Sequence, residues 1–245
     1  HAGLLSPQGK ILVDFFVAPH EGGFLIDMPK ESLDGLVKRL SLYKLRSDVV
    51  IEPEPDMRVA AIWNGTPELP DGAIAFSDPR LPELGFRVLL PDGVLLDDAF
   101  QIASDTDYHA HRMGLGVPHG GLDFAYGEAY PHEALFDQLH GVDFQKGCYV
   151  GQELVARMEY RTSTRRRIVP VEGNAPLETG AEVMAGKLPA GKIGSVDGTR
   201  GLAMLRLDRA AAAEAQGAPL IAGDTPITFH IPEFATFKAP VPEGT

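Results

Sequence analysis

The stretch GLLSPQGKILVDFFV, residues 3–17, predicts how this chain begins to fold. Its two apolar runs flank the turn-forming tripeptide PQG at 7–9, and this arrangement is typical of a β-hairpin. GGFLIDM (22–28) predicts a third strand, and apolar residues at i, i+3, i+4 and i+7 in PKESLDGLVKRLSLYKL (29–45) predict an amphipathic helix. With a further strand expected at 47–53, the segment predicts one helix packed on an antiparallel sheet.

The following residues predict a second, less regular set of helices and strands up to residue 160. A long loop at 116–131 is rich in glycine and proline, and loops of this length in compact domains are often binding loops. The other elements expected are strands at 58–64 and 86–90 and helices at 104–113, 131–141 and 152–158.

After residue 160 the pattern changes to short strand candidates separated by turns. Their close spacing predicts a small antiparallel barrel or sandwich, with 211–219 as a short helix or surface loop. The fold class expected is therefore α+β, with a module at 1–160, divisible into 1–53 and 54–160, followed by a domain at 161–245. The strand candidates lie at 165–173, 181–186, 191–198, 201–208 and 225–232.

Length and charge restrict the classes of protein. The 245 residues exceed the roughly 100–200 of a usual domain, which favours two units. No apolar run approaches the ~18 residues of a membrane span, and the net charge of −12 argues against broad nucleic-acid binding. The exception is a local cluster of five arginines at 157–167, a candidate contact for an anionic ligand. The chain starts at His1, with no secretory signal visible.

The only cysteine, Cys148, lies in KGCYVGQE at 146–153. A single cysteine excludes an internal disulfide and suits a reducing compartment. Lys146 and the helix expected to begin near Gln152 both favour a thiolate, and such settings lower a cysteine pKa from ~8.5 to roughly 3.5–7.5. We therefore predict a reactive, accessible thiol; the alternative is a small buried apolar residue. Because iron–sulfur clusters usually take about four cysteine ligands, one thiol allows only a shared, transient or indirect role in that chemistry.

KGCYVGQE resembles the signature of the YgfZ-type folate-binding proteins, relatives of the aminomethyltransferase of the glycine cleavage system. The resemblance extends over most of the chain, in LLSPQGKILVDFFV, LSLYKLRSDVVI, RMGLGVPHGGLDF, PHEALFDQLHGVDFQKGCYVGQELVARMEYR and GLAMLRLDR. It implies a folate-binding α+β module and a C-terminal β-barrel around a central cavity. Relatives begin with an additional upstream segment, so the chain is expected to be N-terminally incomplete.

The resemblance also implies a function. It is a tetrahydrofolate-linked accessory role in assembling or repairing iron–sulfur enzymes, including tRNA-modifying ones. The partners would be such client enzymes or assembly proteins and the location the bacterial cytoplasm or the mitochondrial matrix. Folate tail carboxylates need cations. The residues expected at the site are Cys148 and Lys146 as functional groups and Arg112, Lys146, Gly147, Tyr149, Gly151, Gln152, Glu153 and Asp14 as folate contacts.

Two departures from the related transferases limit the predicted chemistry. Where they carry a pterin-binding glutamate in Arg-x-Glu-x-Gly, this chain has Gly114, so that Glu128, Glu133 or Glu153 would have to substitute. Where they carry an Asp-Asp pair, it has Val13-Asp14. Losing a positioned acid or base costs about 10²–10⁴-fold, which argues against efficient aminomethyl transfer. A folate-dependent one-carbon transferase and a plain interaction module remain as alternatives.

Histidines offer two further hypotheses. His109, His111, His119 and His132 are candidate metal ligands, although residues i and i+2 of a helix point to different sides. Cys148 with His132 or His140 is a candidate nucleophilic pair.

Overall fold

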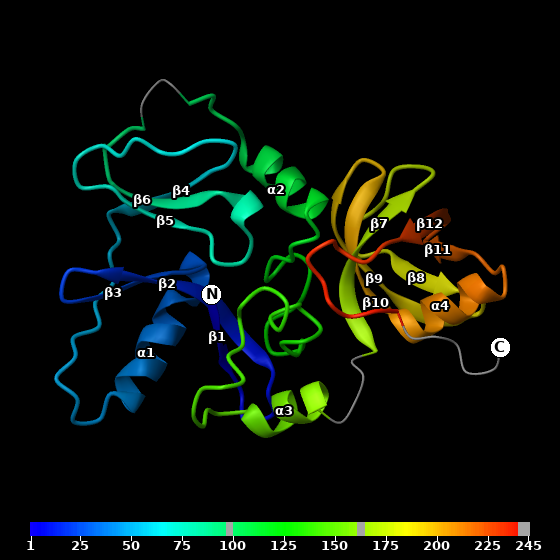
Figure 1. The fold of residues 1–245 in the computed structure, drawn as a ribbon, viewed down its shortest axis with the longest axis horizontal. Helices are drawn as coiled ribbons and strands as arrows, with labels where there is room; N and C mark the ends of the chain where they lie inside the picture. The colour runs from blue at the N-terminus through cyan, green and yellow to red at the C-terminus, as the bar shows by residue number, and fades with distance from the viewer. Residues whose placement is uncertain (97–99, 161–164, 240–245) are drawn as a thin grey trace. The chain divides into compact units, whose positions relative to one another are not determined.

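The computed structural model describes residues 1–96, 100–160 and 165–239, drawn in Figure 1. The chain forms two compact units. One comprises His1–Leu4 and Val13–Ile102, and the other comprises Leu5–Leu12 and Ala103–Thr245. None of the helices within these ranges has the length and hydropathy that a membrane span requires.

The first sheet contains the predicted hairpin and third strand. Its order is β1 (Ala2–Leu5), β2 (Ile11–His20) and β3 (Gly23–Asp27). The amide of Gly9 donates to the Ser6 carbonyl at 2.8 Å, and Gly9 has φ +74°, a conformation that favours glycine. The turn at 7–9 and both neighbouring strands are thus confirmed.

The amphipathic helix predicted at 29–45 is confirmed, but the prediction of a strand at 47–53 is wrong. A short 3₁₀ turn, η1 (Lys30–Ser32), leads into α1 (Leu33–Tyr43), whose Leu36 is buried. Residues 47–53 form neither helix nor strand, and 41–50 are all exposed. Their apolar residues have no neighbouring strand to pair with, which removes the backbone bonds that make a strand stable.

The second sheet has the order β4 (Met57–Ile62), β6 (Phe86–Pro91), β5 (Ile74–Ser77), all antiparallel. The two predicted strands are confirmed as β4 and β6. The sequence analysis missed β5, which is only four residues long, and the 3₁₀ turn η2 (Pro82–Leu84) that precedes β6. Buried Ile62, Val88 and Leu90 form the core beneath this sheet.

Helix α2 (Asp105–Gly114) confirms the helix predicted at 104–113, and it begins at a capping box that the sequence analysis did not identify. The Asp107 amide donates to Ser104 Oγ at 3.2 Å, and the Ser104 amide donates to Asp107 Oδ2 at 2.8 Å. The loop at 116–131 is irregular, with one isolated bridge, and α3 (Gln152–Tyr160) confirms the last predicted helix of this region.

The helix expected at 131–141 is wrong, because this segment is a series of turns. Leu135 and His140 have φ of +62° and +57°, values that a right-handed helix does not allow. Two of its backbone hydrogen bonds span five residues instead of the four of an α-helix. The Phe136 amide donates to the Pro131 carbonyl, and the Gly141 amide donates to the Phe136 carbonyl. Buried side chains rather than helical hydrogen bonds hold the segment, and its Leu135 is fully buried.

The C-terminal strands close into a six-stranded barrel of order β10-β7-β12-β11-β8-β9 (Figure 1). The closed order shows that the domain is a barrel and not a sandwich. It also confirms the five predicted strands, which are β7, β8, β9, β10 and β12. The sequence analysis missed β11. The barrel core includes fully buried Val169, Val183, Ala203 and Leu205. The elements are β7 (Arg166–Gly173), β8 (Glu182–Ala185), β9 (Leu188–Asp197), β10 (Arg200–Arg206), α4 (Leu207–Ala215), β11 (Leu220–Ala222) and β12 (Thr225–Phe229).

Candidate functional site

The candidate site is the Cys148 loop, residues 145–151, which leads into α3. The amides of Gln145 and Lys146 donate to Asp143 Oδ1 at 2.8 and 3.2 Å, which gives the loop its shape. Residues 145–148 are all exposed, and Cys148 is a free, exposed thiol. The predicted exposure of the thiol is confirmed, and the alternative of a buried apolar cysteine is wrong.

The loop ends at a close contact between two glycines. Gly151 has φ +84°, and a Cβ there would lie 2.6 Å from the Ser6 carbonyl oxygen and 2.9 Å from Gly9 Cα. A Cβ on Gly9 would lie 3.2 Å from the Gly151 carbonyl oxygen. The β1–β2 turn therefore fixes the start of α3. Gly147 is different, because nothing lies within 4 Å of its Cβ position.

Lys146, Tyr149 and Gln152 lie within four residues of Cys148 in the sequence. Lys146 Nζ lies 4.8 Å from the centroid of the Tyr149 ring, a cation–π distance. The Tyr149 amide donates to Gln152 Oε1 at 3.0 Å, which ties the loop to the first residue of α3. Burial, with a smaller contribution from Tyr160, raises the pKa of Tyr149, so its phenol is neutral at pH 7. Glu153 is exposed at the start of the helix.

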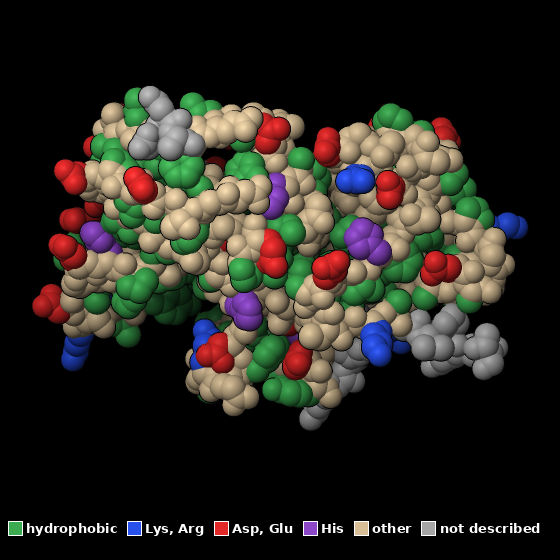
Figure 2. Space-filling view, turned by 45° about the horizontal axis from the view of Figure 1, so that its top comes forward, with side chains coloured by type: hydrophobic (Ala, Val, Ile, Leu, Met, Phe, Trp, Pro, Cys, Tyr) green, Lys and Arg blue, Asp and Glu red, His purple; other side chains and the backbone are tan. Residues whose placement is uncertain are grey.

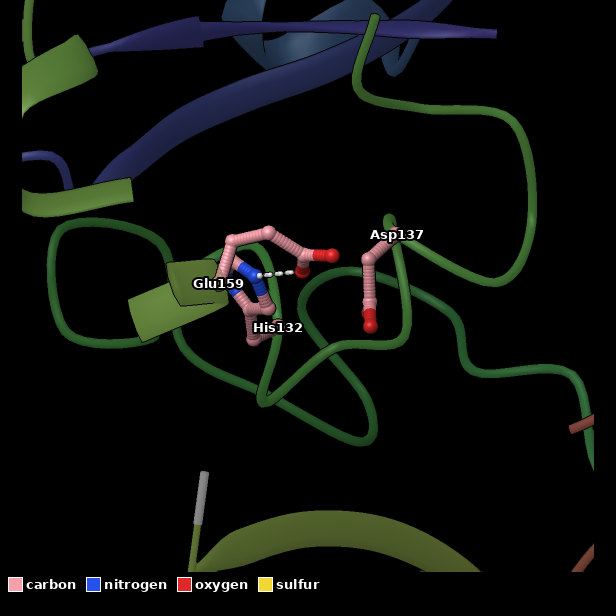
Figure 3. Close-up of side chains that lie close together, drawn as sticks. All are labelled: His132, Asp137 and Glu159. Carbon is pink, nitrogen blue, oxygen red and sulfur yellow. Dashed lines mark hydrogen bonds and ion pairs between the residues drawn. The ribbon is translucent and has the colours of Figure 1, made fainter. Parts of the chain in front are cut away.

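A second cluster holds the other end of α3 (Figure 3). His132 Nε2 lies 3.0 Å from Glu159 Oε2, and one ligand atom from each of His132, Asp137 and Glu159 lies within 4.8 Å of the others. Arg167 Nη1 donates to both oxygens of Asp137, at 2.6 and 2.8 Å. The guanidinium neutralises Asp137 and repels a cation, so we assign the cluster a structural role.

Arg112 lies in a buried network and not in the Cys148 loop. Its guanidinium, 0% exposed, donates to Asp123 Oδ2 at 2.7 Å and to Ser195 Oγ at 2.6 Å. It also donates to the Val117 carbonyl and to His109 Nδ1. Binding a folate tail would require these bonds to break, which corrects the expectation that Arg112 is an available cation.

The other predicted residues are dispersed. Asp14 lies on β2, 3.5 Å from His1 Nε2, in the compact unit that does not contain the Cys148 loop. Glu133 is buried and accepts from the Tyr130 amide at 3.0 Å, whereas Glu128 is exposed. The structure thus brings together Lys146, Gly147, Cys148, Tyr149, Gly151, Gln152 and Glu153.

Two of the histidines proposed as metal ligands or as a partner of Cys148 make other contacts in the structure. His109 Nδ1 is an acceptor for Arg112, and burial, followed by the Arg112 charge, lowers the pKa of His109. His132 is buried and lies 3.0 Å from Glu159 Oε2, whereas Cys148 is exposed, and no hydrogen bond joins the two among the described residues. The cluster around His132 was missed, because Asp137 and Glu159 are distant in sequence and no local pattern links them.

An antiparallel α+β region followed by a closed barrel defines an aminomethyltransferase-like fold. The glycine cleavage system aminomethyltransferase T from Bartonella henselae superposes with a TM-score of 0.62, covering 95% of this chain and 74% of that chain at 12% identity. This likeness concerns the fold alone.

The sequence comparisons indicate a narrower relationship. Residues 165–237 match the family described as CAF17, C-terminal beta-barrel domain. The mitochondrial iron-sulfur cluster assembly factor IBA57 of Homo sapiens is 36% identical over 227 residues, covering 84% of this chain and 64% of that protein. The homologue of Mycosarcoma maydis is 39% identical over 184 residues, covering 70% and 45%.

The chain is therefore related to the CAF17/IBA57 family of iron–sulfur cluster assembly factors. It spans less than two thirds of the length of these two relatives. The narrower resemblance to YgfZ-type proteins stays a prediction.

Proposed function

We propose that the protein is a folate-binding accessory factor in the assembly or repair of iron–sulfur enzymes, with Cys148 as its functional thiol. The single observation that carries this proposal is the exposure of the only cysteine on a loop anchored by Gly151. The relatives' names as iron-sulfur cluster assembly factors support the same class of function.

Cys148 provides one sulfur ligand, and a cluster normally takes about four. We therefore propose that it acts together with thiolates of a client enzyme or assembly protein. The open space around Gly147 supports this, because a partner backbone can approach there without displacing a side chain. We propose that the client enzymes include tRNA-modifying ones. The names of the relatives place them in mitochondria, so we propose the matrix for a eukaryotic source and the cytoplasm for a bacterial one.

Folate fits part of the site. Lys146 is exposed and suits a tail carboxylate, and Tyr149 beside it offers an aromatic face. Arg112 does not fit, since its guanidinium is fully buried. For the pterin edge we propose Glu153, an exposed acidic group at the start of α3. When bound, tetrahydrofolate would supply one-carbon chemistry, while Lys146 and Tyr149 would hold and orient it.

The thiol proposal is tested by complementation in cells that lack the protein. Cys148→Ala and Cys148→Ser should both fail to restore iron–sulfur enzyme activity, while Val150→Ala, an exposed neighbour, should restore it. Full activity with Cys148→Ala at equal protein abundance would refute the role of the thiol.

Folate binding is tested separately by calorimetry with tetrahydrofolate. Lys146→Ala should weaken binding about tenfold, the order expected for one charge-assisted contact, and Lys187→Ala should not. Absence of any heat of binding at millimolar ligand would remove folate from the proposal but leave the thiol role intact.

The second candidate function is folate-dependent aminomethyl transfer, favoured by the likeness of the fold to the Bartonella henselae enzyme. Val13 replaces one aspartate of the Asp-Asp pair that the related transferases carry, and this replacement argues against aminomethyl transfer. Turnover of an aminomethyl donor with tetrahydrofolate distinguishes this candidate from the accessory factor.

A further inference from the structure

A cleft of ≈ 620 Å³ lies in the second compact unit, on the outer face of the barrel. Residues 121–125 and 128–129 form one wall, and parts of β9 and β10 form another. Four basic side chains line it: Arg166, Lys192, Arg206 and Arg209. In the described chain, no residue of the Cys148 loop contributes to its lining.

The strand register places three of these cations on one face. Arg206 of β10 lies directly opposite Arg166 of β7, and Met204, two residues earlier, lies opposite Lys192 of β9. Alternate residues of a strand share a face, so these side chains all project outward. Like charges directly opposite each other destabilise a sheet, so stability alone does not account for the arrangement.

Only part of this positive charge is neutralised. Arg206 donates to Asp208 through Nε at 2.8 Å and Nη2 at 2.6 Å, and Arg166 Nε lies 3.4 Å from Glu133 Oε1. The Asp123 carboxylate in the wall is itself paired with buried Arg112.

Among the described residues, no carboxylate forms an ion pair with Lys192 or Arg209. Arg209 Nη1 donates to the neutral Pro189 carbonyl. Lys192 has Glu182 opposite it on β8, but within the described ranges no ion pair joins the two. The acidic residues of the cleft lining are Asp123 and Glu128. The net charge of the chain is −12, and Figure 2 shows acidic side chains spread over the face that it presents. Two cations without a carboxylate partner among the described residues therefore lie in one cleft of an acidic chain.

We infer that this cleft binds a small ligand with two or more oxyanion groups, either phosphates or carboxylates. Guanidinium groups form paired hydrogen bonds to both kinds of oxyanion, and the Lys192 ammonium adds a point charge. The cleft has the volume of an ordinary small-molecule site, about 300–1,000 Å³. Gly180, Gly191 and Gly194 are among the lining residues, and a Cβ on Gly180 would lie 3.6 Å from Lys192 Cε. This site is separate from the Cys148 loop and does not depend on the function proposed above.

Titration calorimetry of the whole 245-residue chain at low ionic strength tests the inference, with tripolyphosphate and triglutamate as the two probes. At least one probe should bind at a ratio of one to one, and affinity should fall as salt is added. Lys192→Ala and Arg209→Ala should each weaken binding about tenfold. Lys187→Ala, an exposed lysine outside the cleft, is the matched control and should change affinity less than twofold.

The two probes identify the source of the oxyanions. Binding of tripolyphosphate alone assigns a phosphate ligand, and binding of triglutamate alone assigns a polycarboxylate. If neither binds, or if Lys187→Ala weakens binding as much as Lys192→Ala, the inference is wrong. Arg209→Gln replaces Arg209→Ala if the alanine variant lowers the melting temperature.

Discussion

Gly151 and Gly9 lie back to back, each with positive φ, so that neither position has room for a side chain. This contact joins the turn of the first hairpin to the residue that precedes α3. Two segments far apart in sequence thereby fix the loop that carries the only cysteine. The contact makes the placement of Cys148 dependent on residues near the N-terminus.

Gly151→Ala should destabilise the protein by about 2 kcal/mol or more. The left-handed conformation alone costs an L-residue roughly 1–2 kcal/mol, and the new Cβ would also meet the Ser6 carbonyl. Urea denaturation measures the change. Gly147→Ala is the control, because its Cβ position is open. Equal stability of the two variants would contradict the packing described.

Arg112→Ala should cost about 3–5 kcal/mol, because it leaves the Asp123 carboxylate buried without its partner. Thermal and chemical unfolding measure the loss. Arg39→Ala, on the exposed side of α1, should change stability by less than about 0.5 kcal/mol. A loss below 1 kcal/mol for Arg112→Ala would show that the network around it is not stabilising.

Cys148 should react in the folded protein with one equivalent of iodoacetamide, at least as fast as in the denatured chain, because the thiol is exposed. Mass spectrometry of timed samples measures the rate. Lys146→Ala should slow the reaction and Lys187→Ala should not, since only the first removes the cation nearest in sequence to the thiol. Protection of the thiol until the protein unfolds would contradict the exposed loop.

The capping box of α2 should make stability depend on pH at the acidic end. Hydrogen bonds from the Ser104 backbone and then from its side chain lower the pKa of Asp107 below 3.8. The folded-state pKa is depressed, so this contribution is present above the unfolded pKa and lost as the pH falls through the folded pKa. The melting-temperature difference between wild type and Asp107→Asn should therefore shrink between pH 5 and pH 2. A constant difference over that interval would exclude a role for the ionised cap.

Local signals in the sequence predicted most of the elements. The turn residues at 7–9, the apolar spacing at 29–45 and the short C-terminal strands all act over a few residues, so the sequence displays them directly. Residues 47–53 have the composition of a strand but pair with no strand of the described chain. Residues 131–141 have helix start and stop signals, but the segment forms a series of buried turns. Tertiary contacts decide such segments, and single-sequence patterns do not record them.

In the candidate site too, contacts between residues close in sequence could be predicted, and contacts between residues distant in sequence could not. Residues 146–153 are contiguous, so Lys146, Cys148 and Gln152 lie near one another by sequence alone, and their shared role stays a prediction. Arg112 was expected to face a ligand because its motif resembled a binding motif, but its partners Asp123 and Ser195 come from elsewhere in the chain. The same limit hid the pairing of His132 with Glu159.

Closure of the barrel restricts how a partner protein can recognise that domain. Each of its six strands, β7 to β12, already has a neighbour on both sides, so an incoming peptide finds no strand edge on which to continue the sheet. Recognition of the barrel must therefore proceed through side chains and connecting loops. Its contacts will be chemically specific rather than based on the backbone, and the domain lacks the edge-to-edge route to aggregation.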